Sequence, residues 1–217
     1  EVDFFTLHPI TGWELMYLGL QEPIYISAGA APVDLSHPIT ITIIYKGTEI
    51  SVYLNGNPIT YYNDIKRPSN TWIAIGLWVP PPNVESHSIS YDNLSVWNLD
   101  TVFAPPTVIL EPTAIPTPAP WIAEFGAPIL LAIQDRVPDY QDDFSQGSSG
   151  WNPSPGGTVN ITNGILALSG GVGQGVDFVK VPRTNFTNFV VQVEVNTQKL
   201  INGCQVTIQW RGGADGP

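Results

Sequence analysis

The amino-acid sequence predicts an all-β protein, an antiparallel β-sandwich of the jelly-roll type. Only 12% of the 217 residues are charged, whereas helix-rich soluble proteins need many more charged side chains to solvate their outer faces. The chain also contains 21 Pro and 20 Gly, which favour many turns. Several short segments alternate apolar and polar residues and are separated by turn residues. Such strands at regular spacing are typical of antiparallel sandwiches and barrels.

The expected strands are rich in β-branched and aromatic residues. They are residues 39–45, 49–54, 72–79, 88–97, 161–168, 188–195 and 204–210. In 72–79, the apolar residues at alternate positions share one face, which we expect to point into the core. These residues are Ile73, Ile75, Leu77 and Val79. Asn55 and Gly56 form a turn signal, because both residues tolerate positive φ.

The chain divides into two β-rich blocks, residues 1–98 and residues 141–217. Between them, residues 99–120 contain six prolines and predict an extended linker of at most roughly 70 Å, at about 3.1 Å per residue. Residues 121–140 begin with an apolar stretch, which we expect to form a short helix or a docking segment. Pro128 is expected to confine any helix to the residues that follow it.

Short motifs give each block a family resemblance. The second block opens with Asp142, Asp143 and Phe144, continues with Gly150 and Trp151, and later contains the sequence NGILAL at 163–168. This order resembles the first half of a concanavalin A-like (laminin-G-like) sandwich, of the type related to 3-keto-disaccharide hydrolase-like modules. The sequences YLNG at 53–56, IGL at 75–77 and YDNLSV at 91–96 resemble the second half of the same fold.

The closing half of this fold therefore precedes the opening half, and the numbering is expected to begin inside a domain. Three arrangements remain open: one period of a tandem-repeat protein, a subunit whose second block completes the first block of the next copy, or a permuted chain that closes on itself. A half sandwich leaves an apolar face and unpaired strand edges exposed. We therefore expect the first block to be completed by residues 141–217 of a neighbouring copy or repeat.

These features predict a structural repeat unit of a secreted extracellular filament or cell-surface stalk, whose partners are further copies of itself. The resemblance implies this location, since such modules often occur in tandem in secreted bacterial surface proteins. The net charge of −11 argues against binding to nucleic acid or to anionic membranes. No apolar run is long enough to cross a membrane as a helix. A single cysteine, Cys204, excludes an intrachain disulfide and a cysteine zinc site.

The alternative function is that of a glycan-binding module of a surface adhesin. Trp72 and Trp78 share one face of an expected strand with the small residues Ala74 and Gly76, and could stack against sugar rings. Members of the resembled family often bind glycans on a sheet face or at its loops. The competing interpretation is that the two tryptophans pack against a neighbouring domain or against the apolar segment after the linker.

A degenerate carbohydrate-active enzyme is a third hypothesis, but we expect no enzyme. Glucanase relatives of the fold carry three acids on one strand, and here Thr6 follows Glu1 and Asp3 at the third position. The three histidines are isolated in sequence and predict loop positions rather than a metal or catalytic site; they are His8, His37 and His87.

No cofactor and no metal site are predicted, although four acidic residues are weak candidates for Ca²⁺. They are Asp64, Asp92, Asp142 and Asp143, and no single loop supplies enough acids. Aspartates at such places more often cap turns.

Glycosylation is a further expectation for a secreted chain. Three sequons occur, at Asn93, Asn160 and Asn185. The linker contains Thr107, Thr113 and Thr117, which its composition suggests as O-glycan sites.

Overall fold

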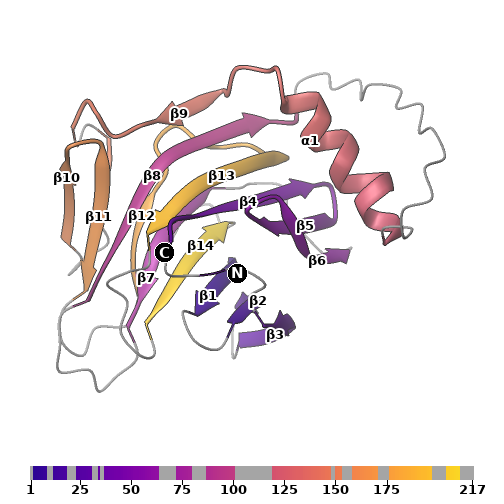
Figure 1. Ribbon diagram of the computed structural model, residues 1–217, viewed down its shortest axis with the longest axis horizontal. Coiled ribbons are helices and arrows are strands. Elements are labelled where there is room, and N and C mark those ends of the chain that lie inside the picture. The colour runs from indigo at the N-terminus through magenta and orange to yellow at the C-terminus, as the bar shows by residue number, and fades with distance from the viewer. Residues whose placement is uncertain are drawn as a thin grey trace.

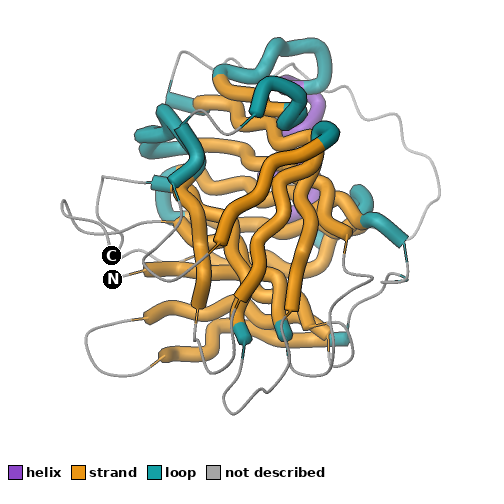
Figure 2. Tube along the Cα trace, turned by 90° about the vertical axis from the view of Figure 1, so that its left-hand side faces the viewer, coloured by secondary structure: helices purple, strands orange, loops and turns teal. Residues whose placement is uncertain are grey.

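The structure, a computed structural model, is a sandwich of two antiparallel β-sheets (Figure 1). It describes residues 2–8, 12–18, 23–30, 34, 37–63, 72–79, 87–100, 119–147, 150–152, 158–170, 176–196 and 204–210. Strands make up most of this part of the chain, and the helix is confined to one place (Figure 2). The predicted all-β antiparallel sandwich with one short helix is therefore confirmed.

The elements follow one another along the chain in this order: β1 (Val2–His8), β2 (Gly12–Leu18), β3 (Pro23–Gly29), β4 (Ile39–Lys46), β5 (Glu49–Leu54), β6 (Asn57–Asn63), β7 (Ile73–Trp78), β8 (His87–Asn98), the π-helical turn η1 (Ile122–Gly126), α1 (Ala127–Ile133), β9 (Tyr140–Asp142), β10 (Thr158–Thr162), β11 (Ile165–Gly170), β12 (Val176–Lys180), β13 (Phe189–Asn196) and β14 (Gln205–Trp210).

Both sheets are woven from strands of the two β-rich blocks. The six-stranded sheet has the order β12-β7-β14-β1-β2-β3, and the larger sheet follows β10-β11-β8-β13-β4-β5-β6, with β9 paired to β8. In Figure 1, β8 of the first block lies between β11 and β13 of the second. Likewise, β7 lies between β12 and β14, and β14 pairs with β1. Neither block supplies a complete sheet by itself.

The two blocks thus complete each other within one chain. Completion of the first block by residues 141–217 of a neighbouring copy or repeat stays a prediction. The same pairings would form if the two blocks came from different copies, because the linker and the helical segment separate even β8 from β9, the paired strands of the two blocks that are nearest in sequence.

The core lies between the sheets and is built from the alternating apolar faces. The predicted inward face of β7 is confirmed, since Ile73, Ile75 and Leu77 are at most 1% exposed. Alternate apolar residues of β5, β13 and β14 also belong to this cluster of buried side chains. Tyr91 of β8 crosses the core and donates a hydrogen bond to the carbonyl oxygen of Gly76, at 2.6 Å.

Two Asn-Gly pairs make two-residue hairpins. Asn55 (φ 49°) and Gly56 (φ 76°) join β5 to β6, and Asn163 (φ 55°) and Gly164 (φ 76°) join β10 to β11. Two successive residues with positive φ match the twist of a two-residue hairpin. The expectation of one strand over 161–168 was therefore wrong, because the Asn-Gly pair inside it turns the chain back.

A helical segment covers the outer face of the larger sheet. Phe125, Ile129 and Ile133 are buried in a second apolar cluster on this face. Its other buried members are Ile44, Tyr53, Trp97 and Val190, from four strands, and Leu99, directly after β8. The apolar segment after the linker therefore does form a short helix that docks on the sheet. The expected limit at Pro128 was wrong, because helical structure begins before it. Pro128 lies in the first turn of α1, where its missing N–H is tolerated.

No described helix is long and apolar enough to span a membrane.

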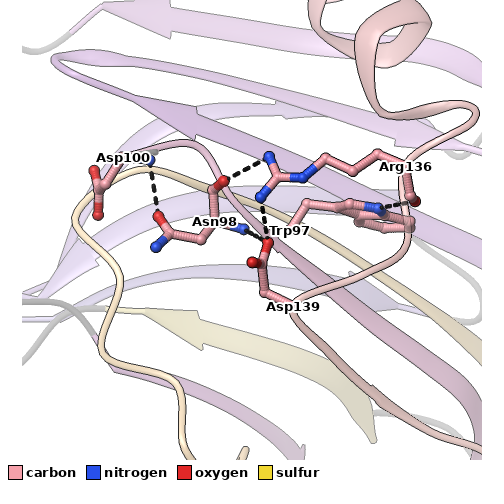
Figure 3. Close-up of polar contacts among 5 residues, drawn as sticks. All are labelled: Trp97, Asn98, Asp100, Arg136 and Asp139. Carbon is pink, nitrogen blue, oxygen red and sulfur yellow. Dashed lines mark hydrogen bonds and ion pairs between the residues drawn. The ribbon is translucent and has the colours of Figure 1, made fainter. Parts of the chain in front are cut away.

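A polar network fixes the chain that leaves the helix to the end of β8 (Figure 3). Arg136 donates from Nη1 to the carbonyl oxygen of Asn98 at 2.8 Å and forms an ion pair with Asp139 at 2.6 Å. The indole of Trp97 donates to the carbonyl oxygen of Arg136 at 2.9 Å. Asp139 also accepts the backbone N–H of Asn98 at 2.8 Å. This network ties residues 136–139 to the first block.

A second polar contact joins the two blocks beside this network. Asp100 accepts the backbone N–H groups of Thr187 and Asn188, at 2.7 and 3.0 Å. The side chain of Asn188 in turn accepts the backbone N–H of Gly47 in the β4–β5 turn. Three segments that are distant in sequence are therefore held together by charge-assisted and backbone hydrogen bonds.

Candidate functional site

The outer face of the six-stranded sheet carries the predicted tryptophans. Because side chains alternate along a strand, Trp72, Gly76 and Trp78 lie on the side of β7 opposite to the core. Their neighbours on β14 and β1 are set by the register, in which Gly76 pairs with Thr207 and Thr207 pairs with Thr6. The result is a central row of small residues with aromatic side chains around it.

Trp72 is already engaged by the neighbouring strand. Its ring stacks on Phe178 of β12, with centroids 6.4 Å apart and planes 19° apart. The Nζ atom of Lys180 lies 5.0 Å from the Trp72 centroid, which is cation–π geometry. One face of this indole is therefore used for packing within the sandwich, and its Nε1 atom has no hydrogen-bond partner among the described residues.

Trp78 lies at the other end of β7, opposite Gln205 of β14. Its side chain is half-buried, and no ring contact is recorded for it within the described part of the chain. Trp72 and Trp78 thus share a face, as predicted, but their surroundings differ. Whether either residue binds a glycan stays a prediction.

Thr207 is the residue of this face that the sequence analysis missed. It is 2% exposed, and its hydroxyl has no partner among the described residues. A buried hydroxyl without a partner costs stability, so such groups need an explanation. The sequence pattern that could have placed Thr207 on this face is the alternation over 205–210. There Gln205, Thr207 and Gln209 alternate with apolar core residues.

His8 and Glu14 meet at the β1–β2 end of the same face. Their side chains lie 3.3 Å apart, between His8 Nε2 and Glu14 Oε2. With Trp13, Ala28 and Gly29 they line a small cavity of about 260 Å³. His8 therefore lies in a strand and not in a loop, so the loop expectation was wrong for this residue. His87 begins β8, so the loop expectation was wrong for this residue too; its side chain is outside the described residues. His37 lies outside the strands, 3.1 Å from Asp34.

Asp3 lies on the opposite face from these groups. It pairs with Trp210, shares the inward side of β1 with Phe5 and Leu7, and is fully buried. The second acid of the glucanase-like pattern therefore points away from the outer face.

The acidic opening of the second block holds a turn together. Asp142 accepts the indole N–H of Trp151 at 2.8 Å, the hydroxyl of Tyr140 at 3.3 Å and the backbone N–H of Phe144 at 2.7 Å. Asp143 accepts the backbone N–H of Ser145 at 3.0 Å. The hydrogen bonds from Ser145 lower the pKa of the Asp143 carboxyl.

The weak Ca²⁺ candidates do not converge within the described residues. Asp142 and Asp143 line a polar cavity of about 570 Å³ together with Arg183. Among the described residues no group of three or more metal-ligating side chains occurs. Asp92 accepts the backbone N–H of Asn93, and Asp64 lies outside the described residues.

The three sequon asparagines are all exposed. Asn93 lies in β8 with a φ of 48° and donates to Glu194 at 3.1 Å. Asn160 lies in the edge strand β10 and accepts the hydroxyl of Thr162 at 2.9 Å. Asn185 precedes β13. Thr107, Thr113 and Thr117 lie outside the described residues, and glycosylation at any of these positions stays a prediction.

Comparison with known proteins identifies no family. No protein-family model matches the chain, and no curated protein matches it. What the chain shares with the resembled family is the coarse architecture, an antiparallel two-sheet sandwich.

Proposed function

We propose that the protein is a structural unit of an extracellular filament or cell-surface stalk, in which copies or successive repeats are joined head to tail through one shared β-sandwich. The observation that carries this proposal is that strands of the two blocks alternate within both sheets. β7 and β8 of the first block each lie between two strands of the second, so each block needs the other to satisfy its strand edges.

The chemistry of the interface supports the same proposal. The cluster between the sheets contains fully buried side chains from both blocks, for example Phe5 and Ile41 with Val191 and Ile208. Burial of such side chains is worth roughly 1.5–3 kcal/mol each, so separated blocks would be strongly driven to find a complement. The complement can come from the same chain or from another copy, and head-to-tail exchange generates an open filament unless it closes into a ring.

The test is the size distribution of the purified full-length chain. Light scattering after size exclusion, at concentrations from micromolar to millimolar, is expected to show masses that rise as multiples of the monomer. Negative-stain images are expected to show linear assemblies. Two differently tagged versions, mixed in urea and refolded together, should co-purify. A single monomeric mass over the whole range, with no co-purification, would contradict the proposal.

A second candidate function, glycan binding, is favoured by the half-buried indole of Trp78 on the outer face of the six-stranded sheet. Gln205 of β14 is opposite Trp78, so an amide side chain lies beside this ring. An amide group beside a partly exposed aromatic ring is the kind of polar and apolar mixture that positions a small polar ligand.

The test of this second function is a titration of tryptophan fluorescence with oligosaccharides. Trp78→Ala is expected to weaken binding at least tenfold, because a bound sugar ring would lose the aromatic face on which it stacks. The matched control is Thr184→Val, which removes a buried hydroxyl that donates to the carbonyl oxygen of Val181 at 2.8 Å. This control should lose stability and keep any sugar affinity. No response to any sugar would end this candidate.

A further inference from the structure

One segment crosses the boundary between the two blocks, and this inference about it rests on the proposed function. Residues 119–142, here called the strap, come after the linker and so belong in sequence with the second block. Their contacts are nevertheless mostly with the first block. The strap comprises η1, α1 and β9.

The start of the strap binds through aromatic contacts. Trp121 stacks on Tyr61 of β6, with centroids 5.6 Å apart and planes 11° apart. It also meets Tyr53 of β5 edge-on at 6.0 Å, and Phe125 meets Tyr61 edge-on at 5.7 Å. Aromatic pairs of this geometry contribute beyond the area they bury.

The end of the strap binds through polar contacts and strand pairing. Arg136 and Asp139 bind the backbone of Asn98, as described above. β9 then pairs with residues 94–96 of β8, where Leu94 is opposite Asp142 and Val96 is opposite Tyr140. The strap is therefore fixed to the first block at both ends and along the helix between them.

The linker is long compared with the span that the strap covers. The helical residues 120–133 extend over roughly 20 Å at about 1.5 Å per residue. The helical part of the strap ends shortly before Arg136, which binds Asn98, so the chain between Asp100 and residue 119 has to return over about this distance. Residues 101–118 can extend over roughly 56 Å at about 3.1 Å per residue. This length is enough to return to the same copy and enough to leave for another.

We infer that the strap binds the first block of whichever copy completes the sandwich, so that in an assembly it crosses the joint and docks on the partner copy. The partner is a second copy of this chain, and the docking surface is the strip formed by β4, β5, β6 and the end of β8. The strap then stabilises the contact between the two copies, which strand pairing and core packing have formed.

The test is photo-cross-linking between two full-length forms. One form is unlabelled and carries Trp121→benzoylphenylalanine, and the other is wild type labelled with ¹⁵N. The two forms are mixed in equal amounts in urea, refolded together at high concentration and irradiated. In the assemblies, about half of the cross-links from position 121 to residues 57–63 should join an unlabelled peptide to a labelled one. If these cross-links contain only unlabelled peptides, the strap stays on its own copy and the inference is wrong.

The matched control places the same cross-linker at Leu131, which is 45% exposed on the same helix. It should give few cross-links to residues 57–63 in any species. This control separates docking of the strap from random collision within an assembly.

A deletion distinguishes failure of this inference from failure of the proposed function. If the wild type forms no assemblies, the proposed function fails, and the strap is tested in a variant that lacks residues 102–117. Only residues 101 and 118 then join Asp100 to Ala119, and they span roughly 10 Å, which is too short to return over the helix. This variant is expected to form dimers or larger species with mixed cross-links. A folded monomer, or a chain that stays unfolded at every concentration, would overturn the inference.

Discussion

At the scale of single residues, the acidic opening of the second block acts through hydrogen bonds inside the protein. Asp142 accepts hydrogen bonds from the buried indole of Trp151 and from the backbone N–H of Phe144. Phe144 itself has a positive φ of 55°. A carboxylate with two oxygens can satisfy these donors at once, which a neutral side chain cannot do as strongly. The motif that carried the family resemblance therefore has a structural explanation in this chain.

The first prediction concerns this carboxylate. Asp142→Ala leaves the Trp151 indole and the Phe144 N–H without their acceptor, so the free energy of unfolding should fall by about 1–3 kcal/mol. Asp142→Asn keeps one acceptor oxygen and should lose less. Urea denaturation followed by tryptophan fluorescence measures both variants. Asp143→Ala is the control, since this exposed residue should change stability by about 0.5 kcal/mol or less. Equal losses for Asp142→Ala and Asp143→Ala would contradict the assignment.

At the scale of elements, the helix docks closely because one position lacks a side chain. Gly126, at the junction of η1 and α1, lies directly over Tyr53 of β5, and a Cβ atom at Gly126 would collide with the Tyr53 hydroxyl. Burial raises the pKa of this phenol. The fit between helix and sheet at this point is therefore steric and sensitive to a single carbon atom.

The second prediction is a rescue. Gly126→Ala should destabilise the protein by about 1–3 kcal/mol through overpacking. Tyr53→Phe removes the colliding oxygen, so adding it to Gly126→Ala should restore part of the loss, which a double-mutant cycle in urea measures. Additive losses from the two changes would show that the close approach does not govern docking.

The third prediction concerns pH. Partial burial, with the hydrogen bond and charge of Glu49, raises the pKa of Tyr61 to about 12. The unfolded chain ionises this group near pH 10. The contribution of Tyr61 to the free energy of unfolding is therefore complete below about pH 10 and is lost as pH rises towards 12. The reason is that the unfolded chain releases the phenol proton at lower pH than the folded protein does.

The measurement is urea unfolding at several pH values between 9 and 12. Wild type should lose stability more steeply over this range than Tyr61→Phe. Other tyrosines with a raised pKa, such as Tyr91, are present in both proteins, so the difference between the two curves reports on Tyr61 alone. Parallel curves would mean that the pKa of Tyr61 is not raised in the folded protein.

Some elements could be predicted from the sequence because only one of their faces is apolar. Over most of β13 and β14 apolar core residues alternate with polar ones, so the sequence predicted both the strands and the faces that point into the core. In β1 and β2 the outer face carries Phe4 and Met16, so alternation is weak and neither strand was predicted. β12 is short and was also not predicted.

The candidate site was predictable only in part, for a related reason. Trp72 and Trp78 stand out in a single strand, but the row that joins Gly76, Thr207 and Thr6 depends on the register between distant strands. Register between distant segments follows from the packed fold and is not carried by local pattern. The same limit hid the network around Arg136, whose partners lie about forty residues earlier in the chain.

At the scale of the whole molecule, the weave of the two sheets makes the blocks one cooperative unit. β14 is bound on one side by β7 and on the other by β1, which come from opposite ends of the first block. Loss of β14 would open the six-stranded sheet through its middle, so neither block should keep its structure alone.

The fourth prediction follows from this coupling. Ile208 is fully buried in β14, and Ile208→Ala should lower the free energy of unfolding by about 2–5 kcal/mol. Tryptophan fluorescence and far-ultraviolet circular dichroism should shift together to the same lower midpoint. Ile165→Ala is the matched control, since Ile165 is 41% exposed and its loss should change little. Two separate transitions would show that the blocks fold independently.

The pairing of β1 with β14 also decides how a closed copy responds to a pulling force. Asp3 lies opposite Trp210 and Leu7 lies opposite Val206, so the first residue of β1 and the last residue of β14 leave the sheet at the same end. Hydrogen bonds of an antiparallel pair run across the strands. Tension between Val2 and Trp210 would therefore break these hydrogen bonds one after another, in unzipping geometry. A closed copy should unfold at low force.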